Sequence, residues 1–241
     1  MFSGQSTYDA LLCVLFLVLS YILGSIPFGL LIGRIKGIDL RQKGSHNIGS
    51  TNATRVLGKK LGFLVGFCDS FKGILVVFLL MGLSKANVWT SPIDYSYYGL
   101  AGILGHCYSV FLDFSGGKAV ATTYGVAYLL NPVLGLTVNL GWLFGLLVTG
   151  YVSVGSCLFA VLLVIGGVIL YFFGIQSPVN FWEYLIGSVN LERIIVFAVI
   201  CILIIIKHIP NIKRLINGTE KGFKKHQKER LKLLEEQGNL N

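Results

Sequence analysis

The sequence is short of charge. Asp, Glu, Lys and Arg make up only 13% of the 241 residues, whereas 54% are hydrophobic, and the mean hydropathy is +0.73. A soluble domain of this length carries about twice that share of charged residues. The chain also lacks the alternation of apolar and polar residues that strands of a transmembrane barrel require. Composition therefore favours a helical membrane protein.

The apolar residues are gathered into blocks, several of which approach or exceed the about 20 residues that cross a hydrocarbon core as a helix. The blocks are residues 10–33, 61–83, 97–112, 119–130, 133–150, 154–175 and 194–206. We therefore expect an all-α polytopic transmembrane bundle of about seven membrane segments. Blocks 97–112 and 119–130 are short enough to be tilted or re-entrant, and if neither crosses fully the count falls to five.

Basic residues are scarce on one side of these blocks. The first is Arg34, after the first apolar block, so that block is interpreted as an anchor and not as a signal peptide. Of the 20 Lys and Arg residues, seven lie in residues 34–60 and nine in residues 207–232. By the positive-inside rule the N-terminus lies outside, and the 34–60 loop and the C-terminus are cytoplasmic.

The C-terminal residues are strongly basic. We expect an integral membrane domain over residues 1–220 and a basic cytoplasmic tail over 221–241. A net charge of +9 would suggest nucleic-acid binding in a soluble protein. Here topology and attraction to anionic lipid headgroups explain it, so no nucleic-acid partner is expected.

Several familiar catalytic and ligand-binding motifs are missing. No His is followed by Asp five residues later, which excludes the H-x4-D motif of the commonest glycerolipid acyltransferases. There is no GxSxG elbow and no His, Asp and Glu cluster with metal-ligand spacing. The five cysteines have no CxxC spacing and are interpreted as small buried hydrophobic residues. We expect no metal, no cofactor and no disulfide framework.

Three polar clusters remain, and the predicted topology places all of them on the cytoplasmic face. Polar groups at membrane depth are costly unless they face a cavity or a ligand, so their convergence predicts one site, although each alone would fit an ordinary loop. The first cluster comprises Arg41, Ser45, Asn47, Thr51, Asn52 and Arg55; the second is FSGGKAVATT, residues 114–123; the third is KHIPNIKRLINGTE, residues 207–220.

The second cluster has the clearest chemistry. Ser115 can cap a helix that starts at Gly116 or Gly117, the glycines let backbone N–H groups approach an anion, and Lys118 adds a charge. A Walker A loop would need a Gly five residues before the Gly-Lys pair and a Ser or Thr after it, where this chain has Leu and Ala. The pattern predicts a phosphate site without nucleotide hydrolysis.

The other two clusters add groups of the same kind. Arg55 can bind an oxyanion with two parallel hydrogen bonds. His208 and Asn211 share a face if the last helix continues through them. Asp69 and Lys72, inside the second apolar block, are expected to pair with each other or to face the site. His106 is interpreted as a packed interfacial histidine.

Four stretches now carry a family resemblance: GSIPFGLLIGRIKGIDLRQKGSHNIGSTNATRVLGKKLG, DSFKG, GHCYSVFLDFSGGKAVAT and KHIPNIKRLINGTE. In order and spacing, from residue 24 to residue 220, they resemble the bacterial acyl-phosphate:glycerol-3-phosphate acyltransferases. The resemblance implies transfer of a fatty acyl group from acyl phosphate to sn-glycerol 3-phosphate, giving lysophosphatidate and phosphate in the first acylation of phospholipid synthesis. Neither acyl-CoA nor acyl carrier protein is a donor in that family.

The resemblance also implies a location, partners and site residues. The location is the bacterial cytoplasmic (inner) membrane with the active site facing the cytoplasm, and the partners are glycerol 3-phosphate, acyl phosphate, membrane lipid and a peripheral acyl-phosphate synthase. The implied catalytic residues are Ser45, Arg55, Lys118, His208 and Asn211; the implied substrate-binding residues are Asn47, Asn52, Ser115, Gly116 and Gly117; Glu220 has a structural role.

The chain departs from the family pattern at three positions. His46 stands where the family usually has Gly, Ser109 where Pro is common, and Ser115 where Lys often precedes the Gly-Gly-Lys triplet. We expect His46 to narrow the backbone approach to substrate or to change its pH response. Loss of a cation at Ser115 is expected to weaken substrate binding without altering the reaction.

The chemistry of the residues agrees with the resemblance. Acyl phosphate is a mixed anhydride with a good leaving group, so the enzyme must chiefly position the reactants and stabilise charge. We expect Arg55 and Lys118 to hold the phosphates, and Ser45 and Asn211 to orient the attacking hydroxyl. His208 and the substrate phosphate remain alternative bases. A transporter for an organic phosphate is the alternative function, opposed by the location of all three clusters on one face. A membrane scaffold ranks third.

Overall fold

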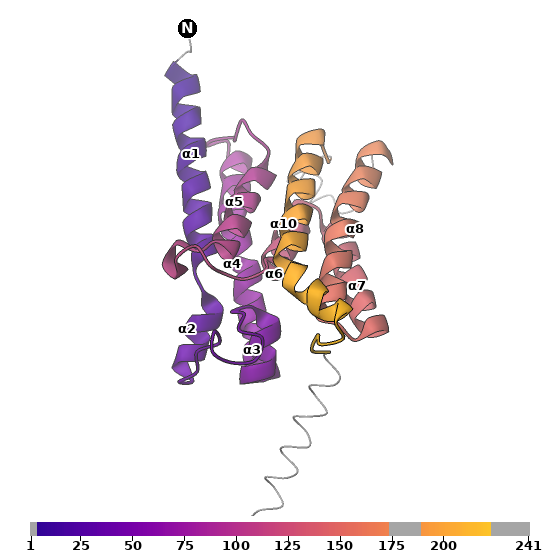
Figure 1. Cartoon of the computed structure of the whole chain (residues 1–241). Coiled ribbons are helices and arrows are strands. Elements are labelled where there is room, and N and C mark those ends of the chain that lie inside the picture. The colour runs from indigo at the N-terminus through magenta and orange to yellow at the C-terminus, as the bar shows by residue number, and fades with distance from the viewer. Residues whose placement is uncertain (1–3, 174–188, 223–241) are drawn as a thin grey trace, which may run out of the picture.

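The computed structural model describes residues 4–173 and 189–222, and these form a bundle of helices joined by short loops (Figure 1). The helices are α1 (Gly4–Ser25), α2 (Phe28–Ile35), α3 (Ser50–Leu57), α4 (Lys59–Lys85), α5 (Tyr95–Cys107), the 3-10 turn η1 (Val110–Leu112), α6 (Val120–Leu130), α7 (Pro132–Thr149), α8 (Val152–Phe173) and α10 (Leu191–Ile216). The predicted all-α class is confirmed. The predicted basic tail, residues 221–241, lies almost wholly outside the described residues.

Five of these helical stretches are long and apolar enough to cross a membrane: residues 7–35, 59–85, 132–149, 152–173 and 191–216. The remaining two apolar blocks form the short helices α5 and α6. Their 13 and 11 residues extend about 20 Å and about 16 Å, less than the about 30 Å of a hydrocarbon core. Helix length therefore favours five full crossings over the seven first expected.

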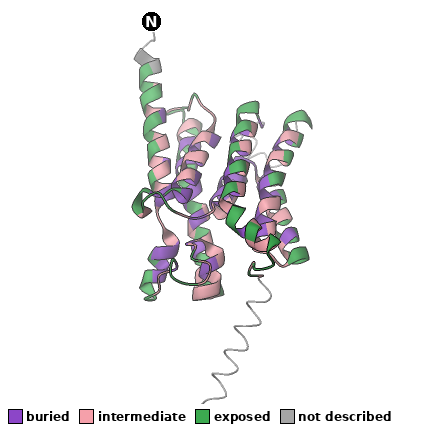
Figure 2. Ribbon diagram, in the orientation of Figure 1, coloured by how far each residue is buried: buried purple, intermediate pink, exposed green. Residues whose placement is uncertain are grey.

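The outer faces of the bundle are apolar and exposed (Figure 2). Phe63 and Phe172 are both 76% exposed, and Ile195 is 53% exposed. Patches of this kind on several helices would be an aggregation hazard in water but match the hydrocarbon of a bilayer. The structure thus agrees with an integral, multi-pass membrane protein.

Glycines let neighbouring helices pack at close range. A Cβ added to Gly105 of α5 would strike the carbonyl oxygen of Tyr21 in α1, and one added to Gly145 of α7 would lie 2.9 Å from the Cα of Gly155 in α8. Without a hydrophobic driving force in lipid, such close backbone packing is a main source of helix association.

The first span is broken between α1 and α2, where Pro27 cannot donate a backbone hydrogen bond. Lys72 of α4 fills the gap: its Nζ donates to the carbonyl of Ile26 at 2.7 Å. The break directs the chain into α2 and the loop before α3, at the end of the bundle opposite the N-terminus (Figure 1). The last turns of α10 and the start of α8 lie at the same end.

The arrangement predicts which loops share a side of the membrane. Single cysteines at Gln42 and Asn217 should react with an impermeant maleimide only from the cytoplasm, and one at Thr90 only from outside, because the basic loops lie at one end of the bundle. All three positions are exposed, and the five native cysteines would be replaced by alanine. Labelling of position 42 and position 217 from opposite sides would contradict this topology.

Candidate functional site

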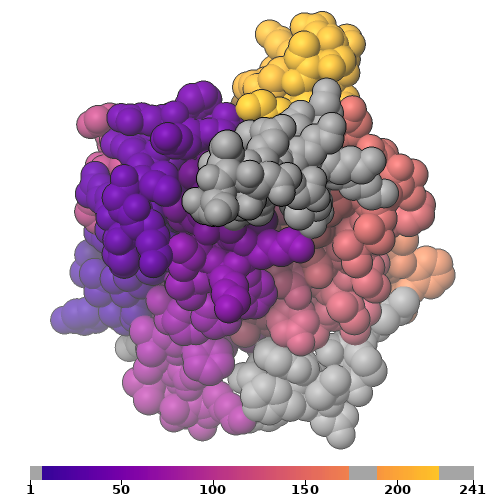
Figure 3. Space-filling model, turned by 90° about the horizontal axis from the view of Figure 1, so that it is seen from below, coloured from indigo at the N-terminus to yellow at the C-terminus, as the bar shows by residue number. Residues whose placement is uncertain are grey.

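A cavity of about 930 Å³ opens among α3, α4, α6, α7, α8 and α10. Seen from the end that carries the loop before α3, this loop and the α7–α8 pair lie on opposite sides of the molecule (Figure 3). All three polar clusters contribute to the cavity wall. The predicted site residues in it are Ser45, Asn47, Asn52, Arg55, Lys118, His208, Asn211 and Glu220. The convergence expected from the sequence is therefore present.

Asn52 organises the first cluster. Its buried amide nitrogen donates to the carbonyls of Leu40, Lys43 and Asn47 at 3.1, 3.0 and 2.8 Å, and its Oδ1 accepts the Ser45 N–H at 2.8 Å. Through these hydrogen bonds the side chain of Asn52 holds the loop before α3 in its conformation. Ser45 is thereby held at the cavity wall by its own backbone.

Arg55 carries a guanidinium that is only partly satisfied by the protein. One terminal nitrogen donates to the carbonyl of Lys221 at 3.1 Å, while the buried Nε has no hydrogen-bond partner among the described residues. Burial lowers the pKa of Arg55, Glu220 partly opposes this, and repulsion from Arg214 adds to it. A buried donor of this kind is suited to an anionic ligand.

Lys118 lies between the glycine pair and α6, and its amine donates to Oδ1 of Asn211. The net pKa of Lys118 is lowered to about 8, chiefly by burial and further by the charges of Arg214 and Arg55, while Glu220 acts in the opposite direction. Two cations thus face one cavity and disfavour each other's charge. An anion bound between them would reverse both shifts.

Glu220 is the anchor of the third cluster. Its Oε1 accepts from Asn211 Nδ2 at 2.7 Å and from Ser153 Oγ at 3.3 Å, and its Oε2 accepts from Arg214 at 2.8 Å. Burial raises the pKa of Glu220, but the hydrogen bonds from Asn211 and Arg214 outweigh it and the net pKa is lowered. The carboxylate is occupied by these partners, which fits the supporting role expected for it.

His208 is oriented by its own helix. α10 continues through Pro210, so His208 and Asn211 lie on one helix face as predicted. The Nδ1 of His208 lies 2.8 Å from the carbonyl of Ile204. Because a carbonyl only accepts, Nδ1 must carry the proton, and Nε2 of the neutral ring is left as an acceptor. The side chain lines the cavity.

The glycine-rich loop differs from its prediction. α6 begins at Val120, after Ala119 in the left-handed region (φ 63°), so a helix start at residue 116 or 117 is wrong. Ser115 is exposed and donates to the carbonyl of Leu112 at 2.6 Å instead of capping a helix. Ser115, Gly116 and Gly117 are not among the residues that line the cavity.

The two glycines pack the loop against α5. A Cβ at Gly116 would strike the carbonyl of His106, and one at Gly117 would strike its imidazole. The N–H of Gly117 donates to the same carbonyl at 3.0 Å. The close approach that the glycines allow is therefore to α5, while the positive N-terminal end of α6, at Val120 and Ala121, faces the cavity.

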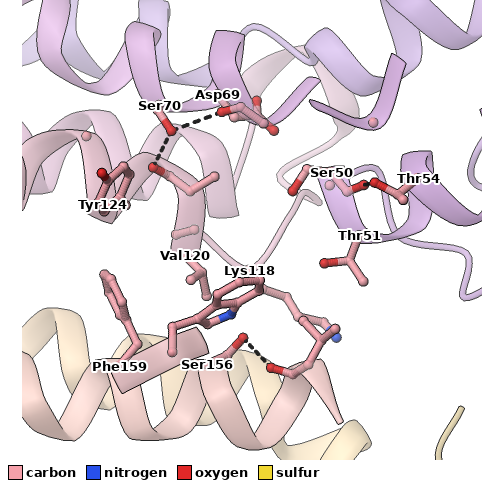
Figure 4. A pocket seen from close by; sticks show the side chains of 18 of the residues that line it. Ser50, Thr51, Thr54, Asp69, Ser70, Lys118, Val120, Tyr124, Ser156 and Phe159 are labelled. Carbon is pink, nitrogen blue, oxygen red and sulfur yellow. Dashed lines mark hydrogen bonds between the residues drawn. The ribbon is translucent and has the colours of Figure 1, made fainter. Parts of the chain in front are cut away.

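Several cavity residues carried no motif in the sequence. One of them is Ser156 of α8, which lies across the cavity from Asp69 and Ser70 of α4 (Figure 4). Ser153 and Ser156 follow a glycine at the start of an apolar helix, a signal too weak to select them. Asp69 was detectable as a charge inside an apolar block.

One part of the cavity wall is apolar and aromatic. Its residues come from α4, α6, α7 and α8, and Figure 4 shows two of them, Tyr124 and Phe159. The others include Phe63, Phe67, Phe71, Ile74, Phe78, Tyr128, Leu129, Trp142 and Leu146. The cavity therefore joins a polar, cationic region to an apolar one.

Comparison with known proteins agrees with this geometry. The family described as glycerol-3-phosphate acyltransferase matches residues 14–218. The chain is 42% identical over 212 residues to the glycerol-3-phosphate acyltransferase of Desulfotalea psychrophila, covering 88% of this chain and 98% of that protein. It is 40% identical to that of Aquifex aeolicus, covering 87% and 98%.

Among solved structures, the chain resembles crystal structures of PlsY, an integral membrane glycerol 3-phosphate acyltransferase. The glycerol 3-phosphate form matches with a TM-score of 0.72 and 37% identity, covering 87% of this chain and 94% of that chain. The lysophosphatidic acid form matches with a TM-score of 0.70 and 35% identity.

The chain belongs to the glycerol-3-phosphate acyltransferase family. It is an acyltransferase of phospholipid synthesis and an integral membrane enzyme, so the transporter and scaffold alternatives are set aside.

The structure also accounts for two of the three sequence departures in this acyltransferase. His46 has φ 60°, a conformation that favours the Gly usual in the family, and its exposed ring contacts the carbonyl of Arg41 at 2.9 Å. It does not line the cavity. Ser109 donates to the carbonyl of Ser25 at 2.6 Å and so ties the η1 turn to α1.

The packing of the glycine loop predicts the effect of a single methyl group. Gly117→Ala should lower the free energy of unfolding by about 1–3 kcal/mol, because the new Cβ overlaps the His106 ring. Gly82→Ala is the control: it adds a methyl on helix α4 with nothing within 4 Å, so it should be neutral or stabilising. Detergent-solubilised protein would be followed by thermal unfolding. Equal midpoints for the two variants would contradict this packing.

Proposed function

We propose that this glycerol-3-phosphate acyltransferase takes its acyl group from acyl phosphate and acts at the cytoplasmic face of the bacterial inner membrane. The observation that carries the proposal is the pair of partly buried cations, Arg55 and Lys118, at the polar part of a cavity whose other part is apolar. A phosphate with an attached acyl chain matches both parts. A peripheral acyl-phosphate synthase at the same face would supply this donor.

The charge balance of the cavity favours phosphate ligands. Of its two carboxylates, Asp69 pairs with Lys72 at 2.8 Å and Glu220 is occupied by Asn211 and Arg214. Neither forms an ion pair with Arg55 or Lys118, and Glu220 only partly offsets their charge from a distance. We assign Lys118 and the N-terminal end of α6 to the phosphate of glycerol 3-phosphate, and Arg55 to the phosphate of the donor.

The cavity is also large enough for a lipid donor. Its volume, about 930 Å³, lies near the upper end of small-molecule sites, which run to about 1,000 Å³. Aromatic side chains such as Phe67, Phe71 and Trp142 supply the apolar surface for the acyl chain. Each methylene that moves there from water contributes about 0.8 kcal/mol, whereas a chain that enters from the bilayer gains only from its packing against this wall.

The reaction follows from this placement. The free primary hydroxyl of glycerol 3-phosphate, oriented by Ser45 and Asn211, attacks the acyl carbonyl carbon. A C–O bond forms to glycerol, the C–O bond to phosphate breaks, and phosphate leaves with charge stabilised by Arg55. The hydroxyl proton passes to Nε2 of His208, which lines the cavity as an acceptor. A His208→Gln variant that kept its kcat would assign the proton to the substrate phosphate instead.

The donor is tested directly. Membranes that contain the protein should acylate glycerol 3-phosphate with palmitoyl phosphate and leave palmitoyl-CoA unused, because the donor site is built for a phosphate leaving group. Product formation is measured as labelled lysophosphatidate. Membranes with Arg55→Ala serve as the control, expected to lose about ten- to 150-fold of kcat/KM for the donor with loss of one charged contact. Equal use of both donors would overturn the proposal.

The lowered pKa of Lys118 predicts a pH effect. Its ammonium is lost as pH rises through about 8, so kcat/KM for glycerol 3-phosphate should fall above that pH. The arginine of Lys118→Arg stays charged throughout this range, so the fall should disappear even if the maximal rate drops. An alkaline limb that persists unchanged in Lys118→Arg would assign the titration to another group.

A further inference from the structure

Three buried ionisable side chains lie behind the glycine-rich loop, and the proposed mechanism does not use them. They are Asp69 and Lys72 of α4 and His106 near the end of α5, exposed by 2%, 3% and 4%. Lys72 lies 2.8 Å from Asp69, and His106 Nδ1 lies 3.5 Å from the same carboxylate oxygen. We refer to them as the Asp69–Lys72–His106 cluster.

The cluster contacts two other segments of the chain. Lys72 also donates to the carbonyl of Ile26, at the break between α1 and α2. His106 contacts the loop twice: its carbonyl accepts the Gly117 N–H at 3.0 Å, and its ring lies where a Gly117 side chain would be. Lys118 is the next residue.

Burying these charges is expensive and needs an explanation. A buried ion pair in general adds little net stability, because desolvation offsets most of the attraction, and apolar side chains of similar volume often do as well. Here the pair lies at membrane depth, where ionisable residues are costly. Moreover, Asp69 and His106 line the substrate cavity on its inner side. These observations favour a role in the site over one in the fold alone.

We infer that the Asp69–Lys72–His106 cluster positions Lys118. Asp69, neutralised by Lys72, restrains the His106 ring through a 3.5 Å electrostatic contact with Nδ1, an atom that has no hydrogen-bond partner among the described residues. The ring and carbonyl of His106 form the surface on which Gly117 lies, and the loop then directs the Lys118 amine to Asn211 and the cavity. The three residues are positioning residues and touch no reacting atom. This inference rests on the proposed role of Lys118 in binding the phosphate of glycerol 3-phosphate.

A double-mutant cycle separates positioning from simple stability. Asp69→Asn keeps the side-chain shape and removes the charge that orients His106. It should raise the KM for glycerol 3-phosphate by about 3- to 30-fold with little change in the KM for acyl phosphate. In a Lys118→Ala background the same change should alter kcat/KM by less than about twofold, because the group that it positions is gone.

Asp94→Asn is the matched control. Asp94 is also a buried carboxylate held by a cation, with Arg193 at 2.8 Å, but it lies on the α5–α10 contact and does not line the cavity. Asp94→Asn should lower the thermal midpoint without a selective rise in the KM for glycerol 3-phosphate. Its effect on kcat/KM should simply multiply with the effect of Lys118→Ala, as expected for independent sites. His106→Gln, which keeps the backbone carbonyl used by Gly117, is the second test variant and should reproduce the Asp69→Asn pattern.

The outcomes are distinct. The positioning role is overturned if the effects of Asp69→Asn and Lys118→Ala on kcat/KM multiply independently. It is also overturned if a folded Asp69→Asn protein keeps an unchanged KM for glycerol 3-phosphate. Either result leaves the proposed function intact. If Asp69→Asn does not fold, His106→Gln decides by the same criteria. A Lys118→Ala enzyme with unchanged kcat/KM would overturn both the positioning role and the assignment of Lys118 to phosphate.

Discussion

The two cations Arg55 and Lys118, held in one cavity without an ion-pair partner among the described residues, are the constraint on which the rest of the site depends. Burial disfavours the charged forms of both Arg55 and Lys118, and they repel each other. The protein supplies them with neutral acceptors, Asn211 and the carbonyl of Lys221, and keeps both carboxylates of the cavity engaged elsewhere. What remains is a site whose electrostatic balance is completed by an anion.

The other polar groups of the site are each held by a nearby segment of the chain. Glu220 fixes Asn211 from beyond the end of α10, Asn52 shapes the loop that bears Ser45, and the Ile204 carbonyl sets the tautomer of His208. The site is thus assembled from short polar segments that follow membrane helices, and the helices determine its geometry. Because acyl phosphate is already activated, such positioning and charge stabilisation can account for most of the catalysis required.

Much of the site could be predicted from residue type and order. Two local patterns can be interpreted from the sequence alone: the glycines followed by Lys118, and His208 with Asn211 three residues later. The predicted roles of loop residues were wrong where they depended on which residue packs against them in three dimensions. Gly117 was expected to bring backbone to phosphate, yet its space is taken by His106, and Ser115 was expected to cap a helix that begins only at Val120. Asp69 was expected to pair with Lys72 or to face the site, and in the structure it does both.

By itself the sequence determined that this is a helical membrane protein with its polar chemistry in three segments, because hydropathy and charge act on each segment independently of the others. It also determined the family, since the motifs recur in order. Only the tertiary structure decided that α6 begins at Val120 and that the glycine loop lies on His106 instead of facing the cavity. Those outcomes depend on close contacts between residues far apart in the chain, and packing at that range is a property of the assembled helices.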